Sequence, residues 1–528
     1  MNCVRPFLEY AKQHPRQLAL WMPSRGRGPG PAGPGGTASY DEILTLSAKA
    51  QRLCREAGVG PGDSVVLADQ VGPTLYASLV AVLASGATVV IVEPWLPISR
   101  ISAVVDQLGP KMFFTGLIGK VWGSAIPALR RIETWADTRS IPGVAGGELH
   151  VEEADPSTAG IMTFTSGTTG RPKGVVRTHG NMAEQARCFS DCLNPDGHTG
   201  PDLCIFPNFA LPNLVSGRTS VFISGKWRRS DLAELDRLPE HLAPVSISCG
   251  PSFLLRLMEV ARVPSLRTIN ILGATSDCWL LEEGFRRWPG AAWQHAYGSS
   301  EALPVARMDA RESVRESRES GYHQVLCVGR PIPHIAHELE PDGVWVTGGS
   351  VCGEYYGNPD ANRELKRRDA EGRIWHWMGD RIRADGGGGA GGVGARVDGG
   401  EGAQRAEKPP STPKQEDAGA WWYSGRSGQP LEEFELEQRI FSHRRSSKCF
   451  VHRDEEGRLQ LCGLGVAREA DELRRAFPEI DGVVELREMI YDRRHRARLD
   501  RGLSLRRGRS AAGKWFDTAK TWIDWFVR

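Results

Sequence analysis

Apolar and polar positions along residues 1–384 follow helical and strand periods in turn. Residues 41–57 space their apolar side chains as in an amphipathic helix, which Gly58 ends, and residues 63–68 then read as a strand. Further strands are predicted at the apolar runs 160–164, 203–206, 245–248 and 268–272. Repeated alternation of strand and helix predicts an α/β fold, with layered α/β subdomains built on parallel sheets.

The uncharged stretch 71–92 is long enough to cross a bilayer, but its internal pattern argues against a membrane span. Gly86 divides an Ala/Leu-rich segment from the β-branched run 88–92. A buried helix, a glycine cap and a buried parallel strand account for this order. No transmembrane span is therefore expected.

Two segments of low complexity interrupt the periodic pattern. Residues 24–37 are a short Gly/Pro-rich insert, and residues 385–420 are a Gly-rich stretch that we interpret as a disordered hinge or linker. This linker divides a large domain, 1–384, from a small C-terminal domain, 421–528. The small domain is predicted to be α+β, with helices at 432–441 and 470–477 and strands at 449–452 and 459–462.

Composition narrows the possible functions. The chain has 66 basic and 64 acidic residues, a net charge of +2, which excludes a strongly basic nucleic-acid binder as a description of the whole chain. Its 11 cysteines are odd in number and form no C-x-x-C motif, so reduced thiols are expected rather than a disulfide framework or a zinc site. The N-terminal residues lack the apolar core of a signal peptide. These features together predict a cytoplasmic protein.

Residues 164–174, Phe-Thr-Ser-Gly-Thr-Thr-Gly-Arg-Pro-Lys-Gly, carry the most specific chemistry in the sequence. A short strand leads into a loop that contains three glycines, four hydroxyl side chains and Lys173. Glycines let successive backbone N–H groups point inward and form an anion-binding nest, and a lysine adds a mobile positive charge. The loop is therefore predicted to bind a polyphosphate.

This loop resembles the signature loop of the adenylate-forming, AMP-binding enzymes, which include acyl-CoA synthetases, peptide-synthetase adenylation domains and luciferases. Three further motifs follow in the family's order. They are Tyr297-Gly-Ser-Ser-Glu301, Trp377-Met-Gly-Asp380 and Trp422-Tyr-Ser-Gly-Arg426. Shorter stretches at 202–211, 301–305, 327–331 and 494–498 resemble the branch of fatty-acid–CoA ligase-like β-lactone synthetases of olefin biosynthesis.

The resemblance implies a substrate set of ATP, Mg²⁺ and a small-molecule carboxylic acid, and it assigns a role to each matching residue. Catalytic roles fall to Lys173, to Glu301 as the Mg²⁺ ligand, and to Arg498. The ATP- and AMP-binding residues would be Thr165, Ser166, Gly167, Thr168, Thr169, Gly170 and Lys173 on the phosphates, Gly273, Ala274 and Tyr297 on adenine, Gly298 and Ser300 in the loop before Glu301, and Asp380 and Arg426 on ribose or phosphate. Phe206 and Phe209 would line the acyl site, unless they simply pack in the core.

Two departures from the family pattern concern the C-terminal part. Arg498 stands where relatives carry a lysine that bridges carboxylate and α-phosphate, and Lys514 is badly spaced to replace it. Arginine keeps the charge but is planar and forked. Asp385 stands at the expected hinge position, directly before the Gly-rich stretch. These departures favour an alternative hypothesis, a catalytically degenerate nucleotide-binding homologue without turnover.

The leading hypothesis is ATP-dependent activation of a long-chain fatty acid, with or without a β-hydroxyl, as acyl-AMP with release of pyrophosphate. Coenzyme A could then take the acyl group as a thioester, or the β-hydroxyl could close a β-lactone without coenzyme A. The aromatic and basic tail 514–528 could contact a membrane surface or a partner, or pack on its own domain. No nucleic-acid partner is expected.

Overall fold

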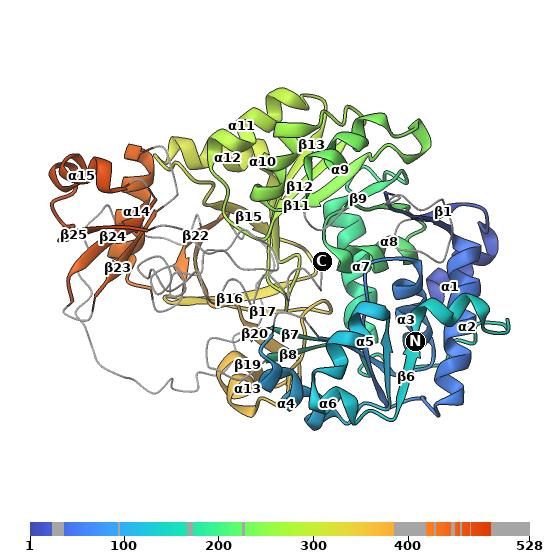
Figure 1. Ribbon diagram of the computed structural model, residues 1–528. Coiled ribbons are helices and arrows are strands. Elements are labelled where there is room, and N and C mark those ends of the chain that lie inside the picture. Colours follow the sequence, from blue (N-terminus) through green and yellow to red (C-terminus); the bar gives the residue numbers. More distant parts are fainter. Residues whose placement is uncertain are drawn as a thin grey trace.

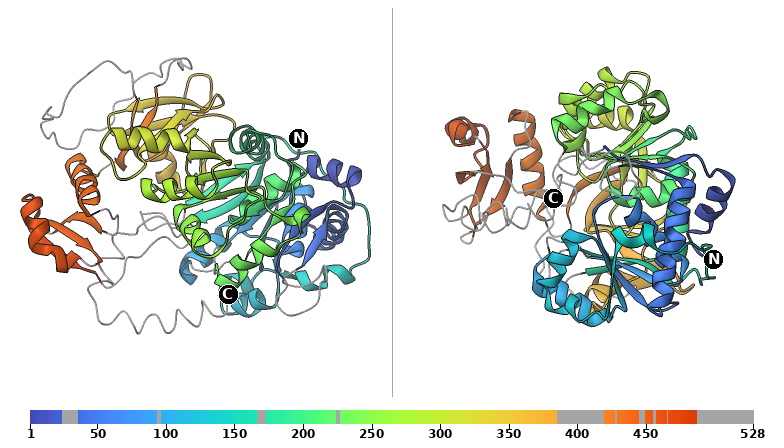
Figure 2. Two further views of the ribbon diagram at one scale, coloured as in Figure 1. Left: turned by 90° about the horizontal axis from the view of Figure 1, so that it is seen from above. Right: turned by 45° about the vertical axis from the view of Figure 1, so that its right-hand side comes forward.

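The computed structural model describes residues 1–23, 36–92, 96–165, 173–223, 227–384, 419–426, 429–444, 449–454, 457–464 and 466–486. Figure 1 shows a large body, coloured blue to yellow, and a small orange-red body at one end of it. The two views of Figure 2 place the small body at the same end. The predicted α/β class with a small α+β C-terminal unit is confirmed.

A seven-stranded sheet forms one layer of the large body. Its strands, in spatial order, are β18 (Tyr355–Tyr356), β8 (Lys173–Thr178), β7 (Ala159–Thr165), β4 (Thr88–Ile91), β3 (Ser64–Ala68), β5 (Met112–Thr115) and β6 (Thr134–Asp137). From β7 to β6 all neighbours are parallel. The stretch 71–92 folds as predicted, into helix α3 (Pro73–Ala84) followed by β4. Gly86 joins them with φ +70°.

An eleven-stranded sheet forms the second layer. Its strands, in spatial order, are β2 (Thr37–Ser39), β1 (Leu18–Trp21), β10 (Ser220–Val221), β9 (Asp202–Cys204), β11 (Ser246–Cys249), β12 (Thr268–Leu272), β13 (Ala292–Tyr297), β14 (Ala306–Asp309), β15 (Cys327–Pro331), β22 (Trp421–Arg426) and β21 (Asp380–Ala384). The predicted strand 268–272 coincides with β12. The runs 203–206 and 245–248 are strands shifted by one or two residues, because adjacent turn residues share their apolar character.

Helices cover the faces of both sheets and enclose the core. They are α1 (Arg5–Gln13), α2 (Tyr40–Glu56), α4 (Ile98–Leu108), α5 (Leu117–Ser124), α6 (Pro127–Arg130), α7 (His179–Leu193), α8 (Ala210–Val215), α9 (Arg229–Glu234), α10 (Pro251–Val260), α11 (Cys278–Arg287), α12 (Ala310–Glu319) and α13 (Pro359–Leu365). The largest core joins α2 and α3 to both sheets, so the two layers pack as one unit. A capping box of Ser39 and Glu42 fixes the start of α2.

A four-stranded sheet closes the large body. Its strands are β16 (Ala336–Glu340), β17 (Gly343–Thr347), β20 (Ile374–Trp377) and β19 (Lys366–Arg368). Three tryptophans, Trp345, Trp375 and Trp377, form a buried cluster within it. Arg367 stacks over two of these rings, with its guanidinium carbon 4.5 Å from the Trp345 centroid and 5.2 Å from that of Trp375. The sheet leads the chain directly into β21, which begins at Asp380.

The Gly-rich stretch connects two strands of one hairpin. Residues 385–418 lie outside the described residues, but the strands on either side, β21 and β22, pair antiparallel with Asp380 opposite Arg426 and Ala384 opposite Trp421. β22 also pairs with β15 and so belongs to the large sheet. The predicted start of the small domain at residue 421 is therefore corrected, because β22 belongs to the large body and α14 of the small unit begins at Leu431. Asp385, the expected hinge residue, lies outside the described residues.

Deletion of residues 385–418 is expected to preserve the fold. It would leave Gly419-Ala420 between the paired residues Ala384 and Trp421, and a two-residue turn with glycine first suits a hairpin. A shorter loop loses less conformational entropy when its ends are brought together, so the free energy of unfolding should rise by about 2 kcal/mol. Denaturant unfolding of the full chain and the deletion variant measures this change. A destabilised deletion variant would show that the insert itself contributes to the fold.

The small unit contains helix α14 (Leu431–Arg444), strands β23 (Cys449–Arg453), β24 (Leu459–Gly463) and β25 (Gly482–Glu485), and helix α15 (Ala470–Ala476). All four predicted elements are present. Helix α14 contacts the large body, since the Gln438 amide donates to Gln324 Oε1 at 3.1 Å and Phe434 packs in a cluster with Met308 and Leu326.

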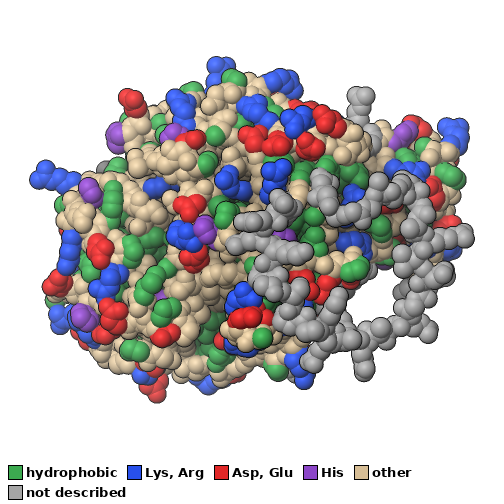
Figure 3. Space-filling model, turned by 180° about the vertical axis from the view of Figure 1, so that it is seen from behind, with side chains coloured by type: hydrophobic (Ala, Val, Ile, Leu, Met, Phe, Trp, Pro, Cys, Tyr) green, Lys and Arg blue, Asp and Glu red, His purple; other side chains and the backbone are tan. Residues whose placement is uncertain are grey.

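The distribution of charged side chains on the surface agrees with the near-neutral net charge of the sequence. Acidic and basic side chains are interspersed over the face shown in Figure 3.

Within the described part of the chain, no helix combines the length and the apolar content that a bilayer crossing requires. All eleven cysteines are buried, and burial raises the pKa of thiols such as Cys3 and Cys54 to about 12.

Candidate active site

The predicted phosphate loop joins two paired strands. Thr165 ends β7 and lies opposite Lys173, the first residue of β8. The loop residues Ser166, Gly167, Thr168, Thr169 and Gly170 lie outside the described residues. The β7–β8 pairing nevertheless holds the two residues that bound the loop, Thr165 and Lys173, opposite each other.

Glu301 and Tyr355 form the centre of the site. Glu301 follows β13 in the loop Gly298–Glu301, and its Oε1 accepts a hydrogen bond of 2.8 Å from the buried Tyr355 hydroxyl. Two lysines flank the Tyr355 ring, with Lys173 Nζ 5.5 Å and Lys366 Nζ 5.0 Å from its centroid. Tyr355 therefore links the phosphate-loop lysine to the carboxylate that the sequence assigns to Mg²⁺.

Glu301 is ionised at neutral pH. Burial raises the pKa of its carboxyl, but His376, the Tyr355 hydroxyl and Lys366 outweigh burial and lower that pKa to about 2. Burial and the nearby Lys366 lower the pKa of His376 to about 3, so this imidazole is neutral at pH 7. The Tyr355 hydroxyl and Lys366 are thus the groups that stabilise the charge of Glu301 near neutrality. Burial lowers the pKa of Lys366 itself to about 8.

The donor set fits Mg²⁺ bound together with a nucleotide. Mg²⁺ is usually held by one or two carboxylates and substrate phosphates rather than by a cage of protein ligands. Glu301 supplies one ionised, half-buried carboxylate, and it shares its neighbour Tyr355 with Lys173. Among the described residues, no group of three or more His, Cys, Asp and Glu side chains is arranged to hold a metal alone.

The residues assigned to adenosine come together from three elements. The Tyr297 hydroxyl, at the end of β13, donates to Asp380 Oδ2 at 2.9 Å, and Asp380 pairs with Arg426 across the β21–β22 hairpin. Gly273 and Ala274 follow β12, the strand beside β13, and Gly273 has φ +88°, which favours glycine at this position. Ser300 lies one residue before Glu301, and its carbonyl accepts from Arg177 at 2.7 Å.

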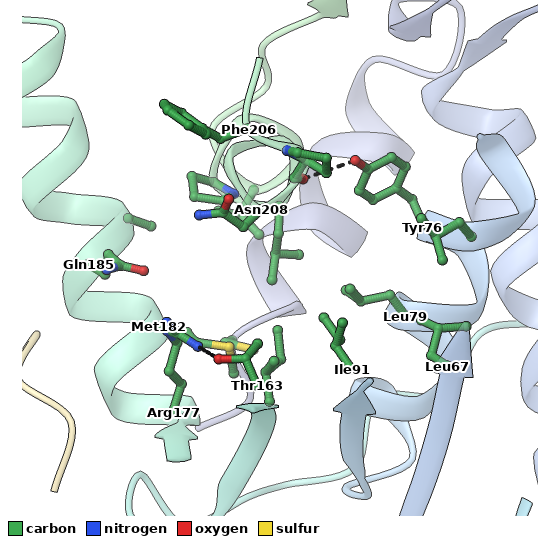
Figure 4. Close-up of a pocket in the computed structure, with 18 of the residues that line it drawn as sticks. Leu67, Tyr76, Leu79, Ile91, Thr163, Arg177, Met182, Gln185, Phe206 and Asn208 are labelled. Atoms are coloured by element: carbon green, nitrogen blue, oxygen red, sulfur yellow. Dashed lines mark hydrogen bonds between the residues drawn. The ribbon is translucent and has the colours of Figure 1, made fainter. Parts of the chain in front are cut away.

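A cavity of about 860 Å³ lies beside this site, between the seven-stranded sheet and helices α3, α7 and α8. Its wall is mainly apolar and includes Leu67, Tyr76, Leu79, Ile91, Ile161, Met182, Phe206 and Leu211. Figure 4 shows Leu67, Leu79 and Ile91 on one side, Met182 and Gln185 of α7 on the other, and the Arg177–Thr163 hydrogen bond at one end. The Tyr76 hydroxyl donates to the Pro207 carbonyl at 2.9 Å and holds the opposite end.

The two predicted acyl-site phenylalanines have different positions. Phe206 lies on the cavity wall. Phe209 is buried behind it, with ring centroids 5.5 Å from Phe206 and 4.8 Å from Phe189, and is absent from the lining residues. Phe209 thus supports the wall by core packing, the alternative that the sequence had left open.

Several site residues were missed by the sequence reasoning. They are Tyr355 of β18, Lys366 of β19 and His376 of β20. These residues surround Glu301 only because the chain folds back. Arg177 lies four residues after Lys173 on β8, a strand that the sequence analysis did not predict; recognising the β-branched run after Lys173 as a strand would have placed both residues on one face. The remaining predicted residues Arg498 and Asp385, and the tail 514–528, lie outside the described residues.

Two buried histidines are expected to make the fold sensitive to acid. Burial lowers the pKa of His179 and of His295 to about 4, against 6.5 for an ordinary histidine. Between pH 6.5 and 4 the unfolded chain therefore binds more protons than the folded chain, and stability falls as the pH falls. Each histidine should cost on the order of 1 kcal/mol per pH unit in this window.

Thermal unfolding measured from pH 7.5 to 4.5 tests this expectation, with His179→Gln as the variant. The variant should lose less stability on acidification than the wild-type protein. An identical pH profile for the two proteins would contradict the assignment of His179.

Comparisons with known proteins agree with the geometry. The family model described as AMP-binding enzyme matches residues 7–354. An olefin beta-lactone synthetase of Stenotrophomonas maltophilia (strain K279a) is 26% identical over 427 residues, covering 72% of this chain and 76% of that protein. A second one, from Xanthomonas campestris pv. campestris, is 26% identical over 436 residues, covering 72% and 75%.

Solved structures share the fold at lower identity. A benzoate CoA ligase from Burkholderia xenovorans LB400 has a TM-score of 0.71 at 15% identity, covering 95% of this chain and 99% of that chain. The O-succinylbenzoate Coenzyme A synthetase of Bacillus subtilis, in complex with AMP, has a TM-score of 0.70 at 18% identity, covering 92% and 95%. The chain therefore belongs to the AMP-binding enzymes, the adenylate-forming ligases that activate an acid as its acyl-AMP.

Proposed function

We propose that this enzyme activates a long-chain fatty acid with ATP. The observation that carries the proposal is the cavity of about 860 Å³, whose wall is mainly apolar and includes Arg177, which donates to the Ser300 carbonyl beside Glu301. An apolar cavity of this size suits an alkyl chain and offers few partners to a polar acid. The similarity to olefin beta-lactone synthetases, and the shared fold with a Mycobacterium tuberculosis fatty acyl CoA synthetase, support the same substrate class.

In the proposed first step the acid's carboxylate oxygen attacks the α-phosphorus of ATP. The α-phosphorus–oxygen bond to the β-phosphate breaks, and pyrophosphate leaves with the bonding electrons. Lys173 and the phosphate loop would bind the β- and γ-phosphates, and Asp380 would accept hydrogen bonds from ribose. Glu301 would hold Mg²⁺, which neutralises phosphate charge when bound. Arg498 would contact the carboxylate and the α-phosphate.

Two second steps remain alternatives within the proposal. In one, the coenzyme A thiolate attacks the acyl carbon and AMP leaves, giving a thioester. In the other, the oxygen of a β-hydroxyl on the same substrate attacks that carbon. The hydroxyl proton passes to solvent, AMP departs, and a four-membered β-lactone is formed. The relatives named as β-lactone synthetases favour the second step, and the relatives named as coenzyme A ligases favour the first.

Pyrophosphate exchange into ATP tests the first step. The full chain is assayed with Mg²⁺ and a series of saturated and 3-hydroxy fatty acids of increasing length. Exchange should depend on the acid, rise with chain length and disappear in Lys173→Ala. If no acid supports exchange although ATP binds, the proposal is overturned in favour of a nucleotide-binding homologue without turnover.

Product analysis distinguishes the second steps. A 3-hydroxy fatty acid and the matching unsubstituted acid are each incubated with ATP, with and without coenzyme A, and the products are identified by mass spectrometry. A lactone formed from the hydroxy acid without coenzyme A supports ring closure. A thioester formed from both acids, only when coenzyme A is present, supports the ligase alternative.

A further inference from the structure

Arg177 lies where the acyl cavity meets the adenylate site. Its Nη1 donates to the Thr163 hydroxyl at 2.9 Å and its Nη2 donates to the Ser300 carbonyl at 2.7 Å. Thr163 is buried and lines the cavity with Arg177, as Figure 4 shows. Ser300 directly precedes Glu301, so one side chain contacts both the cavity wall and the metal-binding loop.

Strand register places Arg177 on the same face as the phosphate-loop lysine. Lys173 lies opposite Thr165 and Arg177 opposite Ile161 in the β7–β8 ladder, and residues two apart on a strand share a face. At about 3.3 Å per residue, the Cα atoms of Lys173 and Arg177 are separated by about 13 Å. A ligand that runs along this face, with phosphates at Lys173 and an alkyl chain in the cavity, therefore passes Arg177 between its two ends.

Arg177 has no direct ion-pair partner in the described protein. Among the described residues no aspartate or glutamate forms an ion pair with it, and its two protein acceptors are a hydroxyl and a carbonyl. A guanidinium offers five N–H donors and suits the planar fork of a carboxylate. A half-buried cation that has no ion-pair partner in the described protein and lines a mainly apolar cavity is costly unless an anion joins it.

We propose that Arg177 binds the carboxylate of the acid before adenylation. The assignment rests on the proposed function for the nature of the acid, and it adds a positioning and specificity residue to that reaction. The Thr163 hydroxyl and the Ser300 carbonyl orient the guanidinium, and its remaining N–H groups hold the carboxylate near the loop of Glu301. Arg177 thus selects acids over uncharged lipids of equal length.

Binding measured without ATP tests the assignment separately from catalysis. Decanoate and decan-1-ol serve as probes of equal chain length, and titration calorimetry compares the wild-type chain with Arg177→Gln. The substitution should weaken decanoate binding at least about tenfold, as expected for a charge-assisted hydrogen bond, and change decan-1-ol binding less than about threefold. Thr163→Val, which removes one orienting acceptor, should give a smaller loss for decanoate alone.

Arg256→Gln is the matched control, because Arg256 is an arginine on α10 that pairs with Glu259 and does not line the cavity. It should leave both affinities unchanged. If Arg177→Gln lowered the affinities for both probes equally, and the affinity for ATP in parallel, Arg177 would have only a structural role in holding the Ser300 loop. That result would overturn the proposal. So would a wild-type chain that does not bind decanoate.

The outcomes also separate this inference from the proposed function. If Arg177 governs decanoate binding but no acid supports pyrophosphate exchange, the carboxylate site stands and the proposed function fails. If exchange occurs and Arg177→Gln leaves the KM for the acid unchanged, the proposed function stands and the assignment of Arg177 fails.

Discussion

Glu301→Gln should lower kcat for acid-dependent pyrophosphate exchange on the order of a thousandfold. Glutamine is nearly isosteric and its carbonyl oxygen can still accept from the Tyr355 hydroxyl, so the loop should keep its conformation. What disappears is the negative charge that Tyr355 and Lys366 stabilise at pH 7. If Glu301 holds Mg²⁺ as proposed, the variant would leave only the nucleotide phosphates to hold the metal, and the charge that develops during pyrophosphate departure would be less well neutralised.

Glu354→Gln is the control for this prediction, because Glu354 also acts on the charge of Lys366 but is not assigned to the site. Exchange kinetics are measured over a series of Mg²⁺ concentrations. The Glu301 variant should need more Mg²⁺ for half-maximal rate, and the Glu354 variant should behave like the wild-type protein. Exchange by Glu301→Gln at the wild-type rate would show that another group holds the metal.

The motifs identified in the sequence locate the site but not its internal contacts. Tyr297 and Asp380 are far apart in the chain, and their motifs alone do not predict the 2.9 Å hydrogen bond between them. Tyr355 belongs to no motif that the sequence reasoning used, yet it contacts Glu301 and both lysines. The first contact joins two distant strands of the eleven-stranded sheet, and the others depend on how the loop after its strand β13 meets the seven-stranded and four-stranded sheets. Local periodicity encodes neither arrangement.

The fold was predictable where one segment carries its own pattern. The strand at 268–272 follows from its run of apolar residues. The order of helix, Gly86 and strand in 71–92 follows from the change in residue type on either side of a glycine cap. The hairpin of β21 and β22 was not predictable in this way. Its strands are separated by residues 385–418, and composition identifies that stretch as a linker without indicating that the flanking strands pair.

Leu79→Trp is expected to shorten the acids that the enzyme accepts. Leu79 projects from α3 into the cavity opposite α7 (Figure 4) and is buried. A tryptophan there occupies space that the far end of a long alkyl chain would fill. Excluding about three methylene groups, at about 0.8 kcal/mol each, should lower kcat/KM for the longest acids on the order of fiftyfold. Acids short enough to end before residue 79 should be unaffected.

The same variant distinguishes a shape effect from general damage. Leu255→Trp is the matched control, because Leu255 is 38% exposed on α10 and does not line the cavity. The KM for ATP should be unchanged in both variants, since neither residue is near Lys173 or Asp380. A loss that is equal for short and long acids would mean that α3 has moved, whereas no loss for any acid would mean that the alkyl chain lies elsewhere. Only a loss that grows with chain length places the substrate in this cavity.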